Sequence, residues 1–326
     1  MGIQAPAEVK FAIIYEAIKQ DGNMLTISYM CKIAGVSRSG FYAWMKAAPA
    51  RQARDDKDFA DFKLILEAYQ FRGYAKGARG IYMRLLHTGT VMNLKKIRRL
   101  MRKYNLLCPI RKANPYRRMA KALATSNVAP NIVNREFRNK PRKILLTDIT
   151  YLFFQDDRCY LSTIFDAFTR EILAYCLSSN MQIEFVLETV DKLVEQYGCT
   201  LDNETIVHSD QGCHYTSYAF IQKLKDKGFV QSMSRKGNCW DNAPQESFFG
   251  HMKDEIKAEI KSCDNITEVT ELIDDWIDYY NYDRYQWDLL KLSPKEFYNY
   301  TQTGIYPLAA VRKSAYSWGS APDPGV

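Results

Sequence analysis

The sequence lacks any long apolar run: nowhere does it reach the roughly 18 consecutive apolar residues that a membrane-spanning helix needs. Its N-terminus lacks the basic-then-apolar layout of a secretory signal peptide. The eight cysteines include no CxxC pair, which argues against a disulfide framework and against the common zinc motifs. These absences argue against membrane-embedded and disulfide-rich secreted proteins, and we expect a cytoplasmic protein.

The chain of 326 residues is long enough for two or more domains. Its composition, 47% apolar and 25% charged, is that of a folded protein. The net charge of +8 is unevenly distributed. Residues 93–143 hold sixteen Lys or Arg and one acid, Glu136, which gives this segment +15 and leaves −7 for the remainder. So long a one-signed stretch favours binding to a polyanion such as nucleic acid, with an unstructured solubilising linker as the alternative.

Two helical modules are expected in the first hundred residues. In SYMCKIAGVSRSGFYAWMK (28–46) a short helix would stop at Gly35, and Ser37 would cap the next helix. This is the layout of a helix-turn-helix, and a plain helical hairpin fits it equally well. A second pair of helices is expected around residues 81–86 and after Asn93, where LKKIRRLMRKYNLL places apolar residues on one face and cations on others.

The proline-containing stretch from Pro109 to Pro141 reads as an extended basic linker. Five β-prone runs follow it: ILLTDITYLFF (144–154), CYLSTIFDAF (159–168), EILAYCLS (171–178), TIVHS (205–209) and FVQSMS (229–234). Helical stretches separate the last three runs, and a long final helix is expected after them. Three successive strands and then alternating helices and strands predict a mixed α/β sheet whose later strands are parallel.

Two carboxylates occupy prominent places in this expected sheet. Asp148 lies inside the first run, which is apolar on both faces as a central strand should be. A buried carboxylate needs a cation, hydrogen bonds or a metal. Asp210 follows the fourth run directly, so the two carboxylates would face each other if their strands are neighbours. Their repulsion calls for divalent cations, and oxygen ligands suit Mg²⁺ or Mn²⁺ rather than zinc.

Glu246 is the best candidate for a third acid at this place. It opens a helix that Asp241 or Asn242 can cap, and 35 residues separate it from Asp210. Lys253 lies seven residues further on, so it shares the same helix face about 10 Å along the axis and can hold a substrate phosphate.

Other polar residues near these strands are interpreted as structural. Asp166, at the end of the second run, is expected to make a structural hydrogen bond. Ser209 has no G-x-S-x-G elbow around it, so it is a poor candidate nucleophile. His208 is expected to be a hydrogen-bonding strut rather than a base.

Several motifs together resemble a known family. TDITY, HSDQGCHYTS and SMSRKGNCWDNAPQESFFGHMKDE, with YYNYDR (279–284) and SPKEF (293–297), resemble the core of bacterial insertion-sequence transposases in the retroviral-integrase superfamily. The resemblance extends from about residue 25 to about residue 300, and it is to the downstream-frame (OrfB-like) product of elements with two overlapping reading frames. It implies an RNase H-like fold in which Asp148, Asp210 and Glu246 are the metal-binding DDE acids and Lys253 contacts DNA.

The domain division that follows is a helix-turn-helix-like module at 1–50, a second helical DNA-binding module at 51–107, a basic linker at 108–140, an RNase H-like core at 141–300 and a tail at 301–326. The other residues expected to contact DNA are Ser37, Arg38, Arg98, Arg99, Arg102, Lys103, Arg111, Lys112, Arg117 and Arg118.

The resemblance also implies the chemistry and the partners. Two Mg²⁺ ions, replaceable by Mn²⁺, would support cleavage at insertion-sequence ends and joining of the freed 3′-hydroxyl to another phosphodiester. The partners would be double-stranded DNA, namely terminal inverted repeats and target, held by two or more copies of the chain at the bacterial nucleoid. No sustained heptad repeat precedes residue 25, so the upstream-frame protein, with its helix-turn-helix and leucine zipper, is a further candidate partner.

Two other functional classes stay open from the sequence. One is an RNase H-like nuclease or resolvase that cuts DNA without joining it. The other is a DNA-binding regulator whose catalytic site is silent. Strand-transfer products would exclude the first, and metal-dependent activity that is lost in Asp148→Asn would exclude the second.

Overall fold

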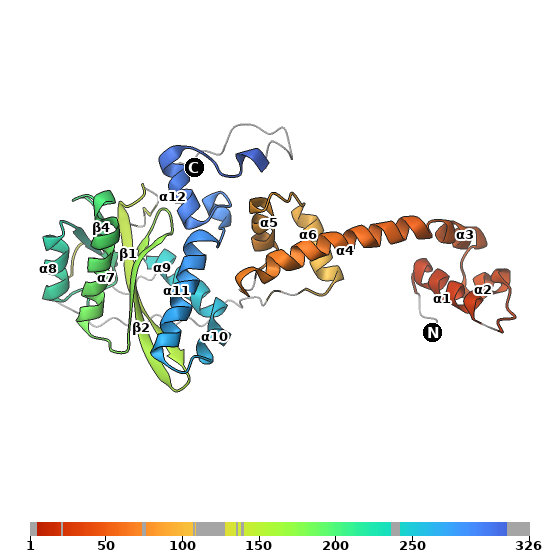
Figure 1. Ribbon diagram of the computed structural model, residues 1–326, viewed down its shortest axis with the longest axis horizontal. Coiled ribbons are helices and arrows are strands. Elements are labelled where there is room, and N and C mark those ends of the chain that lie inside the picture. The colour runs from red at the N-terminus through yellow and green to blue at the C-terminus, as the bar shows by residue number, and fades with distance from the viewer. Residues whose placement is uncertain are drawn as a thin grey trace. The chain divides into compact units, whose positions relative to one another are not determined.

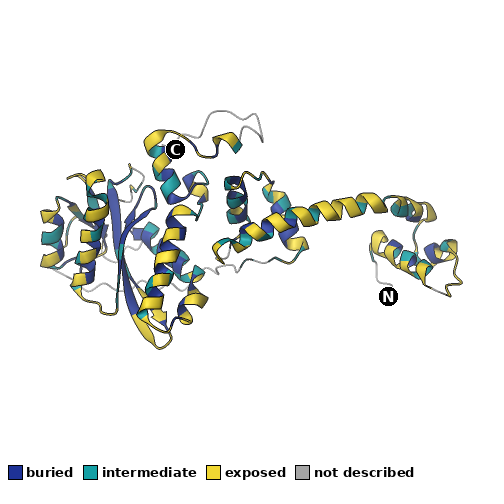
Figure 2. Cartoon of the chain, in the orientation of Figure 1, coloured by how far each residue is buried: buried dark blue, intermediate teal, exposed yellow. Residues whose placement is uncertain are grey.

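The computed structural model describes residues 5–20, 22–73, 76–106, 108, 128–134, 136–137, 140–235 and 242–311. The chain divides into two compact units, Met1–Leu64 and Ile65–Val326. The boundary between them falls inside helix α4 (Ala48–Gln70), most of which is exposed (Figure 2).

The first unit contains three short helices before α4: α1 (Ala7–Lys19), α2 (Ile27–Ala34) and α3 (Arg38–Lys46). Their common core consists of Phe11, Ile14, Met30, Cys31 and Phe41. Gly35 ends α2 in the left-handed conformation (φ 64°), and the Ser37 hydroxyl accepts the backbone N–H of Gly40 at 3.0 Å to cap α3. The predicted helix, glycine turn and capped helix are therefore confirmed.

The second pair of helices is also confirmed. A 3-10 turn, η1 (Phe71–Gly73), precedes α5 (Ala78–His87) and α6 (Leu94–Lys103). The side chain of Asn93 caps α6 by accepting the N–H of Lys95 at 2.8 Å. Ile97, Leu100 and Met101 form the buried face of α6, as the sequence predicts.

The second unit is built on a five-stranded sheet (Figure 1). The strands are β1 (Ile144–Phe154), β2 (Asp157–Asp166), β3 (Ile172–Ser178), β4 (Ile206–Ser209) and β5 (Val230–Met233), in the order β3-β2-β1-β4-β5. The first three strands form an antiparallel meander, and β4 and β5 extend the sheet in parallel to β1. The predicted mixed sheet with β1 at its centre is confirmed.

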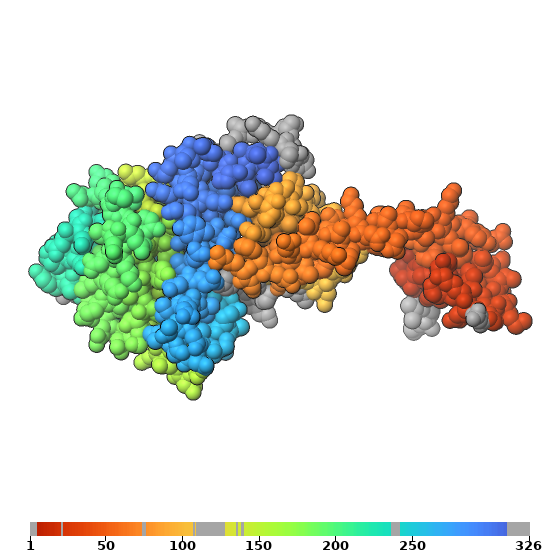
Figure 3. All heavy atoms as spheres, viewed as in Figure 1, coloured from red at the N-terminus to blue at the C-terminus, as the bar shows by residue number. Residues whose placement is uncertain are grey.

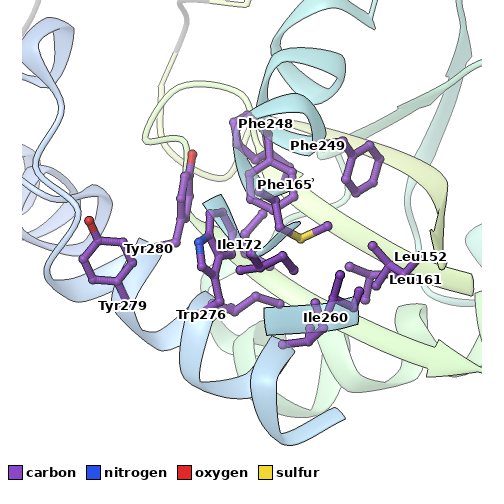
Figure 4. Packing of buried hydrophobic residues seen from close by; sticks show 14 of the residues in the cluster. Leu152, Leu161, Phe165, Ile172, Phe248, Phe249, Ile260, Trp276, Tyr279 and Tyr280 are labelled. Carbon is purple, nitrogen blue, oxygen red and sulfur yellow. The ribbon is translucent and has the colours of Figure 1, made fainter. Parts of the chain in front are cut away.

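Helices cover both faces of this sheet (Figure 1). On one face, α7 (Ile183–Tyr197) and α8 (Tyr218–Asp226) pack against a core that includes Leu145, Val207 and Phe220. On the other face, α9 (Ala243–Glu255) and α11 (Ile266–Tyr282) pack their aromatic side chains on β1 and β2. Figure 4 shows Phe248 and Phe249 of α9 gathered with Phe165 of the sheet and Trp276 of α11.

The prediction of one long final helix is wrong. Helix α9 ends at Glu255 because Ile256 leaves helical geometry (φ −107°, ψ 12°) and is itself fully buried. The chain continues as α10 (Lys257–Lys261), α11, a 3-10 turn η4 (Trp287–Leu289) and α12 (Pro294–Thr303).

Helix α5 is attached to these C-terminal elements. Leu86 packs in a cluster with Leu289 and Phe297. The guanidinium of Arg72 lies 3.2, 2.9 and 3.1 Å from carboxylate oxygens of three acids of α11 and its C-cap, Asp275, Asp278 and Asp283. The space-filling view shows α11 and α12 (blue) beside the end of α4 and α5 (orange) (Figure 3). Among the residues described, none of the helices combines the length and the apolar character needed to span a bilayer.

Candidate active site

The parallel pairing of β1 and β4 brings the first two predicted acids side by side. The register pairs Ile144 with Ile206 and Leu146 with His208. Asp148 lies two residues further along β1, and Asp210 lies two residues after His208, directly after the end of β4. Continuing this register places the two acids level with each other, since neighbouring strands lie about 4.8 Å apart. The sequence prediction that these two carboxylates meet depended on this pairing, which is confirmed.

Asp210 is held by the turn that follows β4. The backbone N–H of Gly212 donates a hydrogen bond to Asp210 Oδ1 at 2.8 Å. A Cβ atom added at Gly212 would lie 2.9 Å from the same oxygen, which is closer than side-chain carbons come to such atoms. Burial raises the pKa of Asp210, and the Gly212 hydrogen bond opposes that rise. A residue without a side chain is therefore needed at 212 to keep the carboxylate in place.

The third acid, Glu246, lies in the first turn of α9. Asp241, one of its two predicted helix caps, lies outside the described residues. Asn242 occupies the N-cap position, but its side chain makes no cap hydrogen bond, so that part of the prediction is wrong. The helix is held instead by its buried face, where Phe248, Phe249 and Met252 pack on the sheet.

The pKa of Asp148 is shifted by burial and by the charges of the other predicted site residues. Its pKa is raised to about 8, first by burial and then by the negative charges of Asp210 and Glu246. The backbone N–H of Ile149, which donates to Asp148 Oδ1 at 2.8 Å, and the positive charge of Lys253 both lower it. The structure thus brings all four predicted residues into one electrostatic site in which the acids repel each other.

Oxygen is the shared donor type in this site. Among the described residues, no three His, Cys, Asp or Glu side chains already converge as a finished metal cluster. The acids nevertheless fit a hard divalent cation, because they offer carboxylate oxygens alone and a bound cation would relieve the repulsion on Asp148. The histidines nearby are engaged elsewhere: His208 Nδ1 lies 2.9 Å from Ser232 Oγ, and His214 Nε2 lies 3.1 Å from the Met181 carbonyl.

The two structural interpretations made from the sequence hold in the structure. His208 is a buried strut between β4 and β5, as its contact with Ser232 shows. Asp166 is fully buried and accepts the backbone N–H of Arg142, Phe168 and Thr169 at 2.9, 2.9 and 3.3 Å.

Part of the basic segment serves the fold rather than a ligand. Arg142 is buried, and its guanidinium lies 3.1 Å from Asp166 and 2.7 Å from Glu171. Lys143 pairs with Glu204 at 2.5 Å. These two cations of residues 93–143, which are not among the predicted DNA-contacting residues, are therefore paired with acids from distant parts of the sequence.

The predicted DNA-contacting residues fall into three groups. On α6 an exposed basic face is present, made of Lys95, Arg98, Arg99, Arg102 and Lys103. Ser37 and Arg38 are exposed at the start of α3, where the Ser37 hydroxyl is used as the helix cap. The third group lies outside the described residues and comprises Arg111, Lys112, Arg117 and Arg118.

One residue of the site was missed from the sequence. Gln245 is fully buried directly before Glu246, and its side chain donates a hydrogen bond to Thr163 Oγ1 on β2. The helical spacing of the sequence could have indicated it. Gln245 lies on the same buried face of α9 as Phe248, Phe249 and Met252, where a polar residue is unexpected.

Family models match three segments of the chain. A model described as Integrase core domain matches residues 138–239, and a second model with that description matches residues 227–292. A model described as HTH-like domain matches residues 56–114. Together the two integrase-core matches include all three acids and Lys253.

Similar proteins come from insertion sequences. InsK of insertion sequence element IS150 from Escherichia coli (strain K12) is 33% identical over 276 residues, which cover 83% of this chain and 93% of that protein. The transposase for insertion sequence element IS904 from Lactococcus lactis is 34% identical over 264 residues, covering 78% and 99%. Among solved structures, the HTLV-2 integrase catalytic core domain in complex with magnesium is 13% identical, with a TM-score of 0.39, and the match covers 49% of this chain and 99% of that one.

Proposed function

This chain belongs to the insertion-sequence transposases that carry an integrase core domain, and from that membership we propose that Asp148, Asp210 and Glu246 are its catalytic acids. The protein is an enzyme of the DDE transposase type, a polynucleotidyl transferase with an RNase H-like α/β core preceded by a helix-turn-helix-like module. The observation that carries the residue assignment is the mutual repulsion of these three acids around Asp148, at the edge where β1 and β4 run in parallel.

The cofactor that suits this site is a pair of Mg²⁺ ions, with Mn²⁺ as a substitute. Carboxylate oxygens are the ligands that these hard cations prefer, and the three acids supply no competing sulfur or nitrogen. Bound divalent cations would activate the attacking water or 3′-hydroxyl and stabilise the leaving oxygen in an in-line displacement at phosphorus.

The chain's own residues place the substrate. The β1–β4 register aligns Asp148 with Asp210, and the Gly212 N–H fixes the orientation of Asp210. Lys253 lies two turns beyond Glu246 on α9, where its ammonium can neutralise the phosphate at the reacting bond. The same arrangement serves both reactions, because end cleavage and end joining are each displacements at a phosphodiester.

The helical modules would bind DNA at segments other than the one that lies at the acids. The exposed cations of α6 would contact the phosphate backbone, together with the linker cations Arg111, Lys112, Arg117 and Arg118. Ser37 and Arg38, at the N-terminal end of α3, would approach base edges as the start of a recognition helix does. Because transposition joins two DNA ends, we expect two or more copies of the chain to act together on DNA.

Membership of the insertion-sequence transposases also supports the proposed domain boundaries at residues 50, 107, 140 and 300. In addition, the upstream-frame protein is proposed as a partner in assembly. Size measurement by light scattering, with and without an end duplex and with and without that partner, tests both forms of association.

The test of the catalytic assignment uses labelled duplexes that end in the element's own inverted repeats, with Mg²⁺. Wild type is compared with Glu246→Gln for end cleavage and for joining to a second duplex. Glu259→Gln is the matched control, because it makes the same change at an exposed glutamate of α10. We expect cleavage and joining from wild type and from the control, and neither from Glu246→Gln. Equal activity of all three proteins would refute the assignment, and cleavage without joining would indicate a nuclease.

A further inference from the structure

A buried hydrogen bond joins the start of α9 to the strand beside Asp148. Gln245 Nε2 donates to Thr163 Oγ1, and both side chains are 0% exposed. Thr163 lies directly opposite Asp148 in the antiparallel ladder of β1 and β2. Residues directly opposite each other in such a ladder project to the same face of the sheet. The hydroxyl that receives Gln245 therefore emerges beside the Asp148 carboxylate.

Gln245 is also the residue directly before Glu246. On a helix, neighbouring residues differ by about 100° in direction, so a helix that rotates or slides at residue 245 moves Glu246 by a similar amount. The buried contacts that follow Gln245 along α9 are apolar and come from Phe248, Phe249 and Met252. The polar contacts of Glu255 with Arg284 and Trp276 lie at the far end of the helix, nine residues beyond Glu246. Apolar packing tolerates small shifts, whereas a hydrogen bond restricts both distance and direction.

The choice of glutamine is not explained by stability. Its second polar atom, Oε1, is buried and has no hydrogen-bond partner among the described residues. An unpaired buried polar atom costs about 1–3 kcal/mol, and an apolar side chain of the same shape would avoid that cost. A role in placing the neighbouring acid accounts for a polar residue at this position.

We propose that the hydrogen bond from Gln245 to Thr163 positions Glu246 relative to Asp148 and thereby sets the affinity of the site for its divalent cation. Gln245 is a positioning residue: it acts through Glu246 and does not touch DNA or metal itself. The inference rests on the proposed metal-binding role of Glu246. Groups that orient metal ligands typically change metal affinity about 10- to 100-fold when they are removed.

The experiment measures Mn²⁺ binding to the full chain by the electron paramagnetic resonance signal of free Mn²⁺, without DNA and without turnover. Gln245→Met removes the donor and keeps the side-chain length, and Thr163→Val removes the acceptor. Thr163→Ser keeps the hydroxyl and serves as the conservative control. Glu246→Gln is the reference for loss of the site.

We expect about tenfold weaker Mn²⁺ binding in Gln245→Met and in Thr163→Val, and near wild-type binding in Thr163→Ser. The double variant Gln245→Met/Thr163→Val should bind no more weakly than either single variant, because both remove the same bond. Its melting temperature should stay close to that of wild type, since both partners become apolar together. A merely structural bond would instead lower stability and leave metal affinity unchanged.

The outcomes separate this inference from the proposed function. Weaker binding in Glu246→Gln with unchanged binding in Gln245→Met and Thr163→Val would overturn the inference alone. Unchanged binding in Glu246→Gln would overturn the metal role of Glu246 and the inference with it. If Gln245→Met does not fold, the inference is decided by comparing the Mn²⁺ affinities of Thr163→Val and Thr163→Ser. If neither Gln245→Met nor Thr163→Val folds, the hydrogen bond is required for folding and the inference is wrong.

Discussion

The carboxylate of Asp148 lies where burial and two other acids oppose its charge, and its pKa is raised to about 8 as a result. The fold bears this cost at one of the three proposed catalytic acids. Residues of this kind lower stability while they raise activity, because their charge is useful only with a ligand in place.

Asp148→Asn should therefore have opposite effects on activity and stability. Strand transfer should fall at least ~1000-fold, a loss of several kcal/mol of transition-state stabilisation. Thermal unfolding at pH 7 in EDTA should move up by about 2–4 °C, which corresponds to ~1 kcal/mol for a domain of this size. The reason is that Asn lacks the penalty that a carboxyl with a raised folded-state pKa imposes at pH values above its unfolded pKa. Asp166→Asn is the contrasting variant and should lower the melting temperature, since Asp166 pairs with buried Arg142. A less stable Asp148→Asn would contradict the electrostatic account of the site.

Gly212→Ala tests the turn that holds Asp210. The added Cβ would lie 2.9 Å from Asp210 Oδ1, so the carboxylate must move. If Asp210 is catalytic as proposed, displacing its carboxylate by a fraction of an ångström should lower the strand-transfer rate about 10- to 100-fold, with DNA affinity in a gel-shift assay unchanged. The control is Gly198→Ala, whose Cβ would meet Val194 at an ordinary 3.5 Å. Full activity in Gly212→Ala would show that the position of Asp210 is not critical.

At the scale of elements, the end of α4 is closed by a buried lysine. The ammonium of Lys76 donates hydrogen bonds to the carbonyls of Phe71 and of Tyr69, the latter at 3.4 Å. Lys76 is only 7% exposed, and burial lowers its pKa to about 8. It thus satisfies carbonyl groups that the helix end leaves without partners.

A pH dependence of stability follows from this lysine. Between about pH 8 and pH 10.5, the unfolded chain still holds the Lys76 proton while the folded chain has released it. The contribution of Lys76 to the free energy of unfolding therefore rises with pH across this window, and Lys76→Met should lack that rise. Chemical denaturation of both proteins at pH 7.5 and 9.5 measures the difference, with exposed Lys225→Met as control. Parallel changes in wild type and Lys76→Met would contradict the prediction.

Elements whose identity depends on local sequence were predictable, and contacts between distant segments were not. The run ILLTDITYLFF coincides with β1, because β-branched and aromatic residues mark strands locally. The break at Ile256 depends on burial in a core assembled from several helices, so the sequence suggested one continuous helix there. Likewise, Arg142 could not be identified as a structural residue without Asp166 and Glu171, which lie 24 and 29 residues away.

The same division applies to the site. From the sequence, Asp148 and Asp210 could be paired only on the condition that the first and fourth strands are neighbours, and the structure meets that condition. The proposed role of Gln245 could not be predicted from the sequence, because it depends on one hydrogen bond to Thr163 of β2, which is 82 residues away in sequence. Candidates for the chemistry could be proposed from residue type and spacing, whereas the residues that support them in the proposed site required the packed structure.

At the scale of the whole molecule, the basic face of α6 should dominate non-specific DNA binding. Arg98→Gln/Arg102→Gln removes two exposed cations from this face. The slope of log affinity against log salt should become shallower by about 1.8, from ~0.9 for each lost phosphate contact. Fluorescence anisotropy with a random-sequence duplex at several salt concentrations gives the slope. Lys225→Gln on α8 removes a similar exposed charge and should leave the slope unchanged; an equal effect from both proteins would show that net charge alone matters.

The attachment of α5 to the C-terminal helices has a consequence for where DNA is cut. Helix α6 packs on α5, and the Leu86 cluster joins α5 to η4 and α12. The ion pairs of Arg72 join η1, the turn before α5, to α11, which packs on the sheet that carries the acids. Phosphates gripped by α6 would therefore stand at a fixed distance from the reacting bond. The site of the cut would be counted in base pairs from the gripped segment, so that inserting a few base pairs between the two would move the cut along the DNA rather than abolish it.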